Sequence, residues 1–363
     1  MRRTPLYDAH VAAKAVMVEF AGWEMPVQYA GAVEETKHVR SKAGIFDLCH
    51  MGRLVVTGPE AVKAVDALVT CNVPKLKVGV CKYGILCNER GGAIDDILVY
   101  KDSDRVHVII NAGNRDRDFR HFLEHCGGYD CEVANASDEQ TMIAVQGPAA
   151  ESIAAPLADA DLKSLGYYRF THGKVLGVPC LISRTGYTGE DGFELFFDRK
   201  HARTMWDGLL AKGRAQDLRP IGLAARDILR TEAGMPLYGH ELDDATNPLE
   251  AGLTFGVDLA KEFWGSKAVK EQVAAGLKRK LVGLRLEERV ARPGYAVLSG
   301  GKPAGKVTSG TPSPTLGTNI AMAFVDAGFA PAGGRCEVDI RGKPSPATVV
   351  PIPFYKRERK KQA

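Results

Sequence analysis

The stretch GGAIDDILVYKDSDRVHVIINA, residues 91–112, holds two apolar runs on either side of the polar KDSD. This pattern predicts an antiparallel pair of strands joined by a turn. Two adjacent carboxylates, Asp95 and Asp96, interrupt the first run. Because side chains alternate across a strand, we expect Asp96 to share a face with Ile94. Asp95 then shares the opposite face with Ile97.

At least one of these two carboxylates therefore borders an apolar layer. An unpaired buried carboxylate costs several kcal/mol, so it has to be hydrogen-bonded, protonated or used in chemistry. The alternative is that the pair belongs to the turn after ERGG and only caps the strand. The pattern alone leaves both interpretations open.

A second pattern occurs twice in the chain and predicts two related lobes. RLVVTGPEAVKAVDALV, residues 53–69, and MIAVQGPAAESIAAPLA, residues 142–158, each predict a strand, a Gly-Pro turn and a helix. Further helices are predicted over 115–128, 201–217 and 222–234, and a second hairpin over 179–198.

From residue 280 onward the texture changes to short strands with Gly and Pro turns, which predicts a compact barrel or sandwich. Strands and helices do not alternate strictly, so the class is α+β rather than a doubly wound sheet. We expect two α+β lobes in residues 1–261, a connector in 262–279 and a β-barrel in 280–363.

Composition restricts the function. The 363 residues contain no apolar run of roughly 20 residues and no signal-like start, and their net charge of +4 is too small to indicate nucleic-acid binding. The eight scattered cysteines form no C-x-x-C pair, which argues against a zinc site and a disulfide scaffold. We expect a cytoplasmic protein with no membrane partner. Phosphate-loop, dinucleotide and nucleophile-elbow motifs are missing, which argues against nucleotide hydrolysis, dinucleotide redox chemistry and serine hydrolysis.

Two further segments carry candidate binding residues. In GYTGEDGFELFF, residues 186–197, Glu194 lies inside an apolar strand, where a carboxylate can accept two parallel hydrogen bonds from an amidine-like edge. Alternatively, Glu194 lies on an edge strand and faces water. Glu190 is expected to be solvated in the turn. Arg226 and Arg230 lie one helical turn apart. Arg226 could bind a substrate carboxylate, or both could form a surface ion-pair ladder.

The chain resembles the aminomethyltransferase, or T-protein, family of the glycine cleavage system. The resemblance rests on seven motifs in order: RTPLYDAH, EFAGWEMPVQY, AGIFDLCHMG, GGAIDDILVY, GYTGEDGFE, RTEAGMPLYGHEL and VTSGTPSPTLGTNIAMAFV. It implies a three-lobed ring of two α+β folate-binding lobes and a C-terminal β-barrel. It also implies transfer of the methylene carbon from the aminomethyl-lipoyl arm of H-protein to tetrahydrofolate. The products would be 5,10-methylenetetrahydrofolate, ammonia and dihydrolipoyl H-protein, and the reaction would need no metal and no nicotinamide.

By position, the resemblance makes Asp96 the catalytic aspartate and Asp95 a supporting group. The residues implied at the folate pocket are Tyr83, Asn111, Tyr187, Glu194, Arg226 and Arg292. Cys49 stands where the family often has serine, and Tyr355 is a weak candidate for a C-terminal folate contact.

Two other activities remain as alternatives. One is a tetrahydrofolate-dependent demethylase of the same fold, which would differ around the carbon donor. The other is a folate-binding iron–sulfur assembly factor. Its K-G-C-[FY]-x-G-Q-E signature is not matched by RTGYTGEDG here, which lacks the cysteine.

The mild positive charge would suit an acidic H-protein surface.

Overall fold

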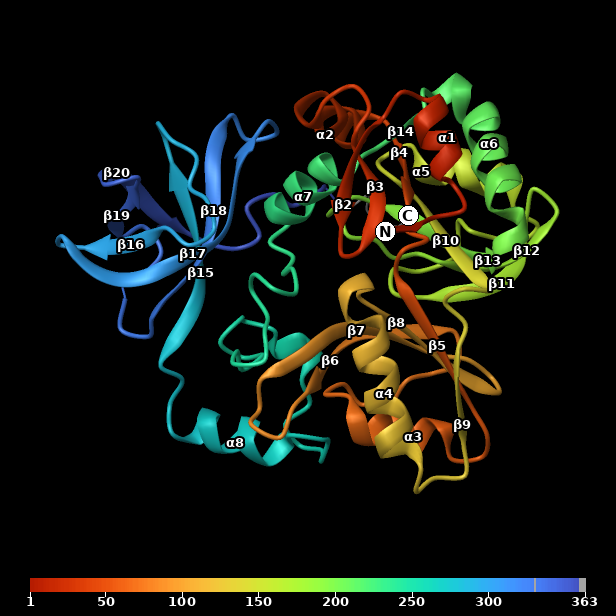
Figure 1. Cartoon of the computed structure of the whole chain (residues 1–363), viewed down its shortest axis with the longest axis horizontal. Helices are drawn as coiled ribbons and strands as arrows, with labels where there is room; N and C mark the ends of the chain where they lie inside the picture. The colour runs from red at the N-terminus through yellow and green to blue at the C-terminus, as the bar shows by residue number, and fades with distance from the viewer. Residues whose placement is uncertain (330, 359–363) are drawn as a thin grey trace.

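The computed structural model describes residues 1–329 and 331–358, and it confirms the predicted α+β class. Figure 1 shows three lobes: a β-barrel, and two α+β lobes beside it. The predicted hairpin of residues 91–112 forms as β7 (Ala93–Lys101) and β8 (Arg105–Ile110), paired antiparallel. It lies in the first α+β lobe.

The first lobe is a five-stranded sheet with two helices on one face. Its strand order is β6 (Val80–Cys87), β7, β8, β5 (Gly52–Thr57) and β9 (Glu132–Asn135). Helices α3 (Ala61–Leu68) and α4 (Arg115–Cys126) cover this face, and η1 (Ala112–Asn114) leads into α4.

The second lobe is a six-stranded sheet built from two distant parts of the chain. Its order is β11 (Phe170–Val175), β12 (Val178–Ser183), β13 (Gly192–Asp198), β10 (Gln140–Gln146), β4 (Gly44–Asp47) and β14 (Arg219–Pro220). One face packs against α1 (Tyr7–Ala12), α5 (Ala150–Ala154) and α6 (Ala202–Gly213). The repeated strand-turn-helix units are thus β5–α3 and β10–α5, one in each lobe.

The two lobes meet through their sheets. Tyr100 and Ile109 from the first sheet share an apolar layer with Phe46, Met142 and Phe196 from the second. The N-terminal segment adds a small sheet of β1 (Arg2–Arg3), β3 (Trp23–Gln28) and β2 (Val16–Phe20), followed by α2 (Ala32–Ser41). Short 3-10 turns are η2 (Ala155–Leu157), η3 (Arg199–His201), η4 (Arg214–Gln216) and η5 (Thr254–Gly256).

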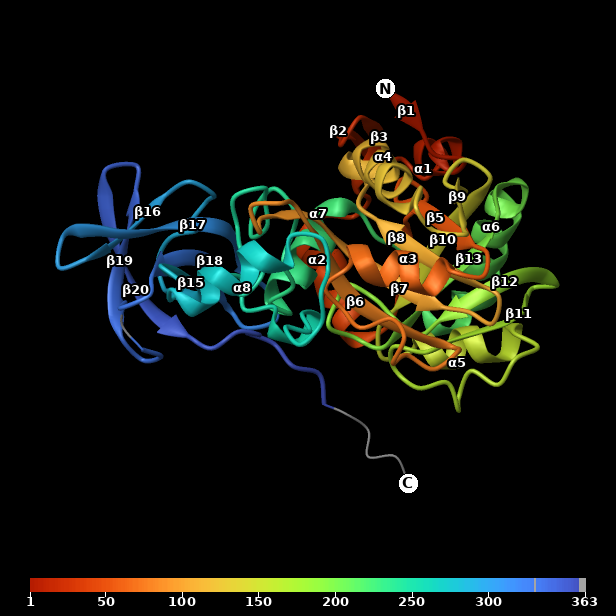
Figure 2. The same cartoon turned by 90° about the horizontal axis from the view of Figure 1, so that it is seen from below.

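The third lobe is a closed six-stranded barrel. Its strands run in the order β15 (Arg279–Leu286), β18 (Thr318–Asp326), β17 (Lys302–Ser313), β16 (Ala296–Ser299), β19 (Arg335–Ile340) and β20 (Lys343–Val350). Helix α8 (Ser266–Ala274) precedes it, and α7 (Leu223–Glu232) packs against β17 and β18. Figure 2 shows the barrel at one end of the molecule, with α7 between it and the other lobes.

Two local findings bear on the predictions from sequence. The expected face of Ile94 is wrong, because a β-bulge opposite Leu86 and Cys87 shifts the start of β7. Ile94 packs with Ile97 in the core under α3 and α4. In the described part of the chain, which includes all eight cysteines, none forms a disulfide and seven are buried. No described helix is long and apolar enough to cross a membrane.

Candidate active site

Strand β7 points its two carboxylates in opposite directions. Asp95 faces α4 and is 0% exposed. It accepts hydrogen bonds from the backbone N–H of Asn111 (2.8 Å), from Asn111 Nδ2 (2.8 Å) and from Asn114 Nδ2 (2.7 Å). Asp96 faces away from α4 and keeps some exposure. The interpretation of the pair as a solvated turn cap is therefore wrong, because both carboxylates lie within the strand.

Two of the predicted residues hold the Asp96 carboxylate. Tyr83 donates its hydroxyl to Oδ2 at 3.1 Å, and Asn111 donates Nδ2 to Oδ1 at 3.0 Å. Burial, and then the negative charge of Asp95, raise the pKa of Asp96 to about 7, while these hydrogen bonds act in the opposite direction. The side chain is therefore able to exchange a proton near neutral pH.

Glu194 lies on the second lobe, in the middle of β13. It is 5% exposed, so the expectation of an edge residue facing water is wrong. The Thr185 hydroxyl donates to Oε2, and in the described structure no protein group donates to Oε1. Burial raises the pKa of Glu194, and the Thr185 hydrogen bond and Arg226 oppose that rise. One carboxylate oxygen is left for a ligand donor.

Tyr187 and Arg226 complete the group. The Arg226 guanidinium lies 4.7 Å from the centre of the Tyr187 ring, and the Tyr187 hydroxyl donates to the carbonyl of Pro236. Burial lowers the pKa of Arg226, and Tyr187 and Glu194 oppose this. Burial raises the pKa of Tyr187, and the nearby negative charge of Asp96 adds to that rise. We call the six residues Tyr83, Asp96, Asn111, Tyr187, Glu194 and Arg226 the Asp96 cluster.

Arg292, the sixth predicted binding residue, does not belong to the Asp96 cluster. It is exposed on the barrel, and its Nη1 donates to the carbonyl of Gly310 at 3.4 Å. Gly310 follows Ser309, whose hydroxyl accepts a hydrogen bond from Arg230. Arg292 thus lies on the side of the barrel that carries α7. Nothing brings it within bonding distance of the other predicted residues.

Sequence analysis missed how deeply Arg230 is buried. It is 1% exposed and forms an ion pair with Glu241 at 3.0 Å, besides its bonds to Asp227 and Ser309. The surface ladder is therefore wrong for Arg230. Its helical spacing gives no signal of this, because Glu241 and Ser309 come from other segments.

The predicted solvent exposure of Glu190 is also wrong, because its side chain is buried, at 6% exposed. Its carboxylate accepts a hydrogen bond from Arg40 at 2.9 Å. Arg40 also pairs with Glu232 on α7 and stacks on the ring of Tyr355 at 4.0 Å. Tyr355 therefore belongs to this structural ion-pair network. Among the described residues, no hydrogen bond, ion pair or ring contact joins Tyr355 to the Asp96 cluster.

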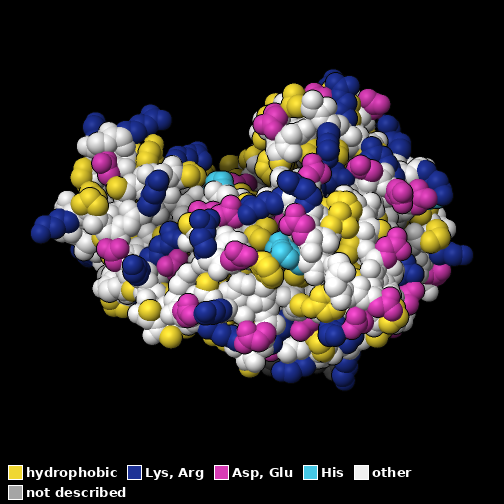
Figure 3. Space-filling model, turned by 60° about the horizontal axis from the view of Figure 1, so that its bottom comes forward, with side chains coloured by type: hydrophobic (Ala, Val, Ile, Leu, Met, Phe, Trp, Pro, Cys, Tyr) yellow, Lys and Arg dark blue, Asp and Glu magenta, His cyan; other side chains and the backbone are white. Residues whose placement is uncertain are grey.

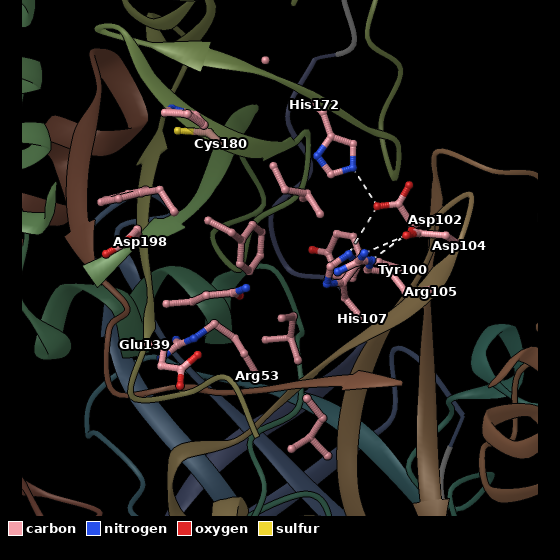
Figure 4. A pocket seen from close by; sticks show the side chains of 18 of the residues that line it. Arg53, Tyr100, Asp102, Asp104, Arg105, His107, Glu139, His172, Cys180 and Asp198 are labelled. Atoms are coloured by element: carbon pink, nitrogen blue, oxygen red, sulfur yellow. Dashed lines mark hydrogen bonds and ion pairs between the residues drawn. The ribbon is translucent and has the colours of Figure 1, made fainter. Parts of the chain in front are cut away.

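A separate cavity of about 660 Å³ opens at the junction of the two α+β lobes. In Figure 4, Asp102 from the first lobe lies between His107 and His172, and dashed lines join it to both. Tyr100 and Phe196 reach this cavity, but no member of the Asp96 cluster lines it. The cavity is thus distinct from the candidate site.

Comparisons with known proteins place the chain in a family. The model of the GCVT N-terminal domain matches residues 6–261, and that of the glycine cleavage T-protein C-terminal barrel domain matches residues 279–356. The chain belongs to the glycine cleavage T-protein family. An aminomethyltransferase from Moorella thermoacetica is 51% identical, over 99% of each chain. One from Rubrobacter xylanophilus is 48% identical, over 99% of this chain and 95% of the relative.

A solved T-protein has the same architecture. The crystal structure of aminomethyltransferase T of the glycine cleavage system from Bartonella henselae matches with a TM-score of 0.92 and 33% identity, covering 98% of each chain. The resemblance and the three-lobed fold stated from sequence are thereby confirmed. The chain is an aminomethyltransferase of this T-protein family.

Proposed function

We propose that this aminomethyltransferase transfers the methylene carbon from the aminomethyl-lipoyl arm of H-protein to tetrahydrofolate. The products are 5,10-methylenetetrahydrofolate, ammonia and dihydrolipoyl H-protein. The family and the full-length aminomethyltransferase relatives support the reaction class. The observation that carries the proposal is the Asp96 cluster, which joins a proton-exchanging carboxyl group to a buried acceptor carboxylate.

The cluster fits a reduced pterin. Such a ring presents adjacent N–H groups along one edge. Oε1 of Glu194 would accept one of them, and the remaining lone pair of Oε2 would accept the second beside the hydrogen bond from Thr185. Tyr83 and Tyr187 supply aromatic surface beside it. Arg226, whose guanidinium is desolvated, would bind a carboxylate of the folate tail, and Arg292 is a second candidate for that contact.

Asp96 would manage the proton during carbon transfer. Tetrahydrofolate, when bound, supplies the nucleophilic nitrogen that takes up the carbon. The carboxylate of Asp96 would hydrogen-bond the N10 region and help to make N5 nucleophilic, while Tyr83 and Asn111 keep it in one orientation. Positioned proton transfer of this kind is typically worth about 10²–10⁴ in rate. Asp96 can accept a proton only when its carboxyl group is ionised. We therefore expect turnover to fall as the pH drops through about 7.

H-protein is the proposed partner. Figure 3 shows Lys and Arg side chains interspersed with Asp and Glu on one face, rather than a block of one sign. With a net charge of +4, the chain suits a transient encounter with an acidic surface. We expect the KM for H-protein to rise with ionic strength, and a KM that ignores salt would contradict electrostatic steering.

The deciding experiment is turnover with aminomethylated H-protein and tetrahydrofolate, against a panel of methylated amines as carbon donors. Release of ammonia and formation of 5,10-methylenetetrahydrofolate only with H-protein would support the proposal. Turnover with a methylated amine alone would instead show a demethylase of the same fold. Asp96→Asn serves as the inactive control in both arms.

A further inference from the structure

Behind Asp96 lies a second acidic pair that the proposed reaction does not use. Asp95 on β7 and Asp118 on α4 are both 0% exposed. Asn114, one helical turn before Asp118, donates Nδ2 to Asp95 Oδ1 at 2.7 Å, so the buried carboxyl group of Asp118 lies beside that of Asp95 between α4 and β7. Two neighbouring carboxyl groups that are both shielded from water cannot both be ionised, so the pair binds one proton.

The hydrogen-bond partners decide which residue carries that proton. Asp95 accepts three N–H groups, two from Asn111 and one from Asn114, at 2.7–2.8 Å. Both carboxyl oxygens of Asp118 are buried, and neither receives a hydrogen bond from an N–H or O–H group in residues 1–329 or 331–358. N–H donors favour the ionised form of a carboxyl group. This difference favours Asp95 as the carboxylate and Asp118 as the neutral acid, with the Asp118 O–H directed at Asp95.

The charges around Asp118 agree with this assignment. Asp95 faces it from β7, the negative charge of Asp96 acts on it from the far side of the same strand, and Arg117 lies next to it on α4. The Arg117 guanidinium is engaged elsewhere, with the hydroxyl of Tyr238 at 3.0 Å and the carboxylate of Asp244. Burial, and then the charge of Asp95, hold the pKa of Asp118 well above its usual range.

A chain of contacts leads from this pair to Asp96. The Asn111 Nδ2 group donates both to Asp95 Oδ1 at 2.8 Å and to Asp96 Oδ1 at 3.0 Å. Asp95 therefore fixes the orientation of the amide that holds Asp96. Its negative charge also favours the protonated form of Asp96. A group that keeps Asp95 ionised and in place therefore affects Asp96 in two ways. It fixes the orientation of the Asn111 amide, and it maintains the negative charge beside Asp96.

We propose that Asp118 is a positioning residue that shares its proton with Asp95 and so anchors Asn111 against Asp96. This inference rests on the proposed role of Asp96. The residue touches neither folate nor the carbon donor. Its O–H group, directed at Asp95, lets the Asp95 carboxylate remain ionised although that carboxylate has no contact with water.

Infrared spectroscopy of the substrate-free enzyme tests the proton directly. We expect a carbonyl band of a protonated carboxylic acid in the wild type at pH 9, where Asp96 is ionised. Asp118→Asn should remove this band, and the surface control Asp207→Asn should leave it. A wild-type spectrum without the band, or a band that survives in Asp118→Asn, would overturn the proposal. Because no substrate is present, this result stands apart from any failure of the proposed function.

Kinetics test the link to Asp96. Asp118→Leu removes the donor, and we expect kcat to fall about tenfold or more while the KM for tetrahydrofolate changes less than about threefold. Asp118→Asn keeps an N–H donor and the net charge, so it should recover most of kcat and leave the pH midpoint in place. Asp95→Asn removes the charge and should move the midpoint to lower pH. If Asp118→Asn moves the midpoint as Asp95→Asn does, Asp118 is ionised and the inference is wrong.

Discussion

Replacing Asp96 by Asn should stabilise the protein at alkaline pH while it removes most of the activity. The variant keeps the size of the side chain and can still hydrogen-bond to Tyr83 and Asn111. It removes the carboxyl group of Asp96, whose pKa is raised to about 7 because its surroundings disfavour the charged form. The effect on stability can be worked out from that shift.

The ordinary pKa of this carboxyl group is 3.8, so the shift is about three units and is worth at most about 4 kcal/mol. Because the folded-state pKa is raised, the stabilising contribution is complete below pH 4 and is lost as the pH rises through 7. Wild-type stability should therefore decline over this window relative to Asp96→Asn. For a chain of this size, 4 kcal/mol corresponds to roughly 5 °C in Tm.

The assay is thermal unfolding of both proteins between pH 4.5 and 8.5, with tetrahydrofolate binding and turnover measured in parallel. We expect the Tm of Asp96→Asn minus that of wild type to grow with pH by several degrees. Folate binding should persist, and kcat should fall by about 10²–10⁴. Asp207→Asn, on the exposed side of α6, is the matched control and should show no such trend. A Tm difference that does not change between pH 4.5 and 8.5 would refute the claim that the surroundings of Asp96 raise its pKa to about 7.

Other changes test neighbouring parts of the structure. Glu194→Gln replaces an acceptor oxygen by a donor and should weaken tetrahydrofolate binding about tenfold or more, measured by calorimetric titration; an unchanged Kd would remove Glu194 from the pocket. Arg230→Met leaves buried Glu241 unpaired and should lower the free energy of unfolding by about 3–5 kcal/mol, and adding Glu241→Gln should restore much of it. Asp102→Asn breaks an inter-lobe pair in which His172 is 60% exposed, so it should cost less than about 1 kcal/mol, while hydrogen exchange in β11 should increase.

Much of the fold could be predicted from local patterns. Alternation and turn residues define β7 and β8, and helical spacing defines α4 and α7, because these signals act over a few residues. The β-bulge before Asp95 could not be predicted this way. It depends on how β7 pairs with β6, and it moves Ile94 to the opposite face from the one that alternation gives.

The candidate site shows the same limit. Asp96 and Glu194 could be selected because a carboxylate inside an apolar strand is unusual. The burial of Glu190 could not, because its partner Arg40 lies 150 residues earlier in the chain. Asp118 gives no local signal either, since an acidic residue in the first turn of a helix is ordinary. Its environment is set by Asp95 from another element.

Helix α7 has a consequence for the role of the barrel. Its ten residues carry Arg226 on the side of the Asp96 cluster. Arg230 and Glu232 extend from the same helix to Ser309 and Ser313 of the barrel, at 2.8 and 2.5 Å. Under the proposed role of Arg226, the C-terminal lobe therefore contributes to ligand affinity indirectly: these two hydrogen bonds fix α7, and α7 sets the position of the Arg226 guanidinium.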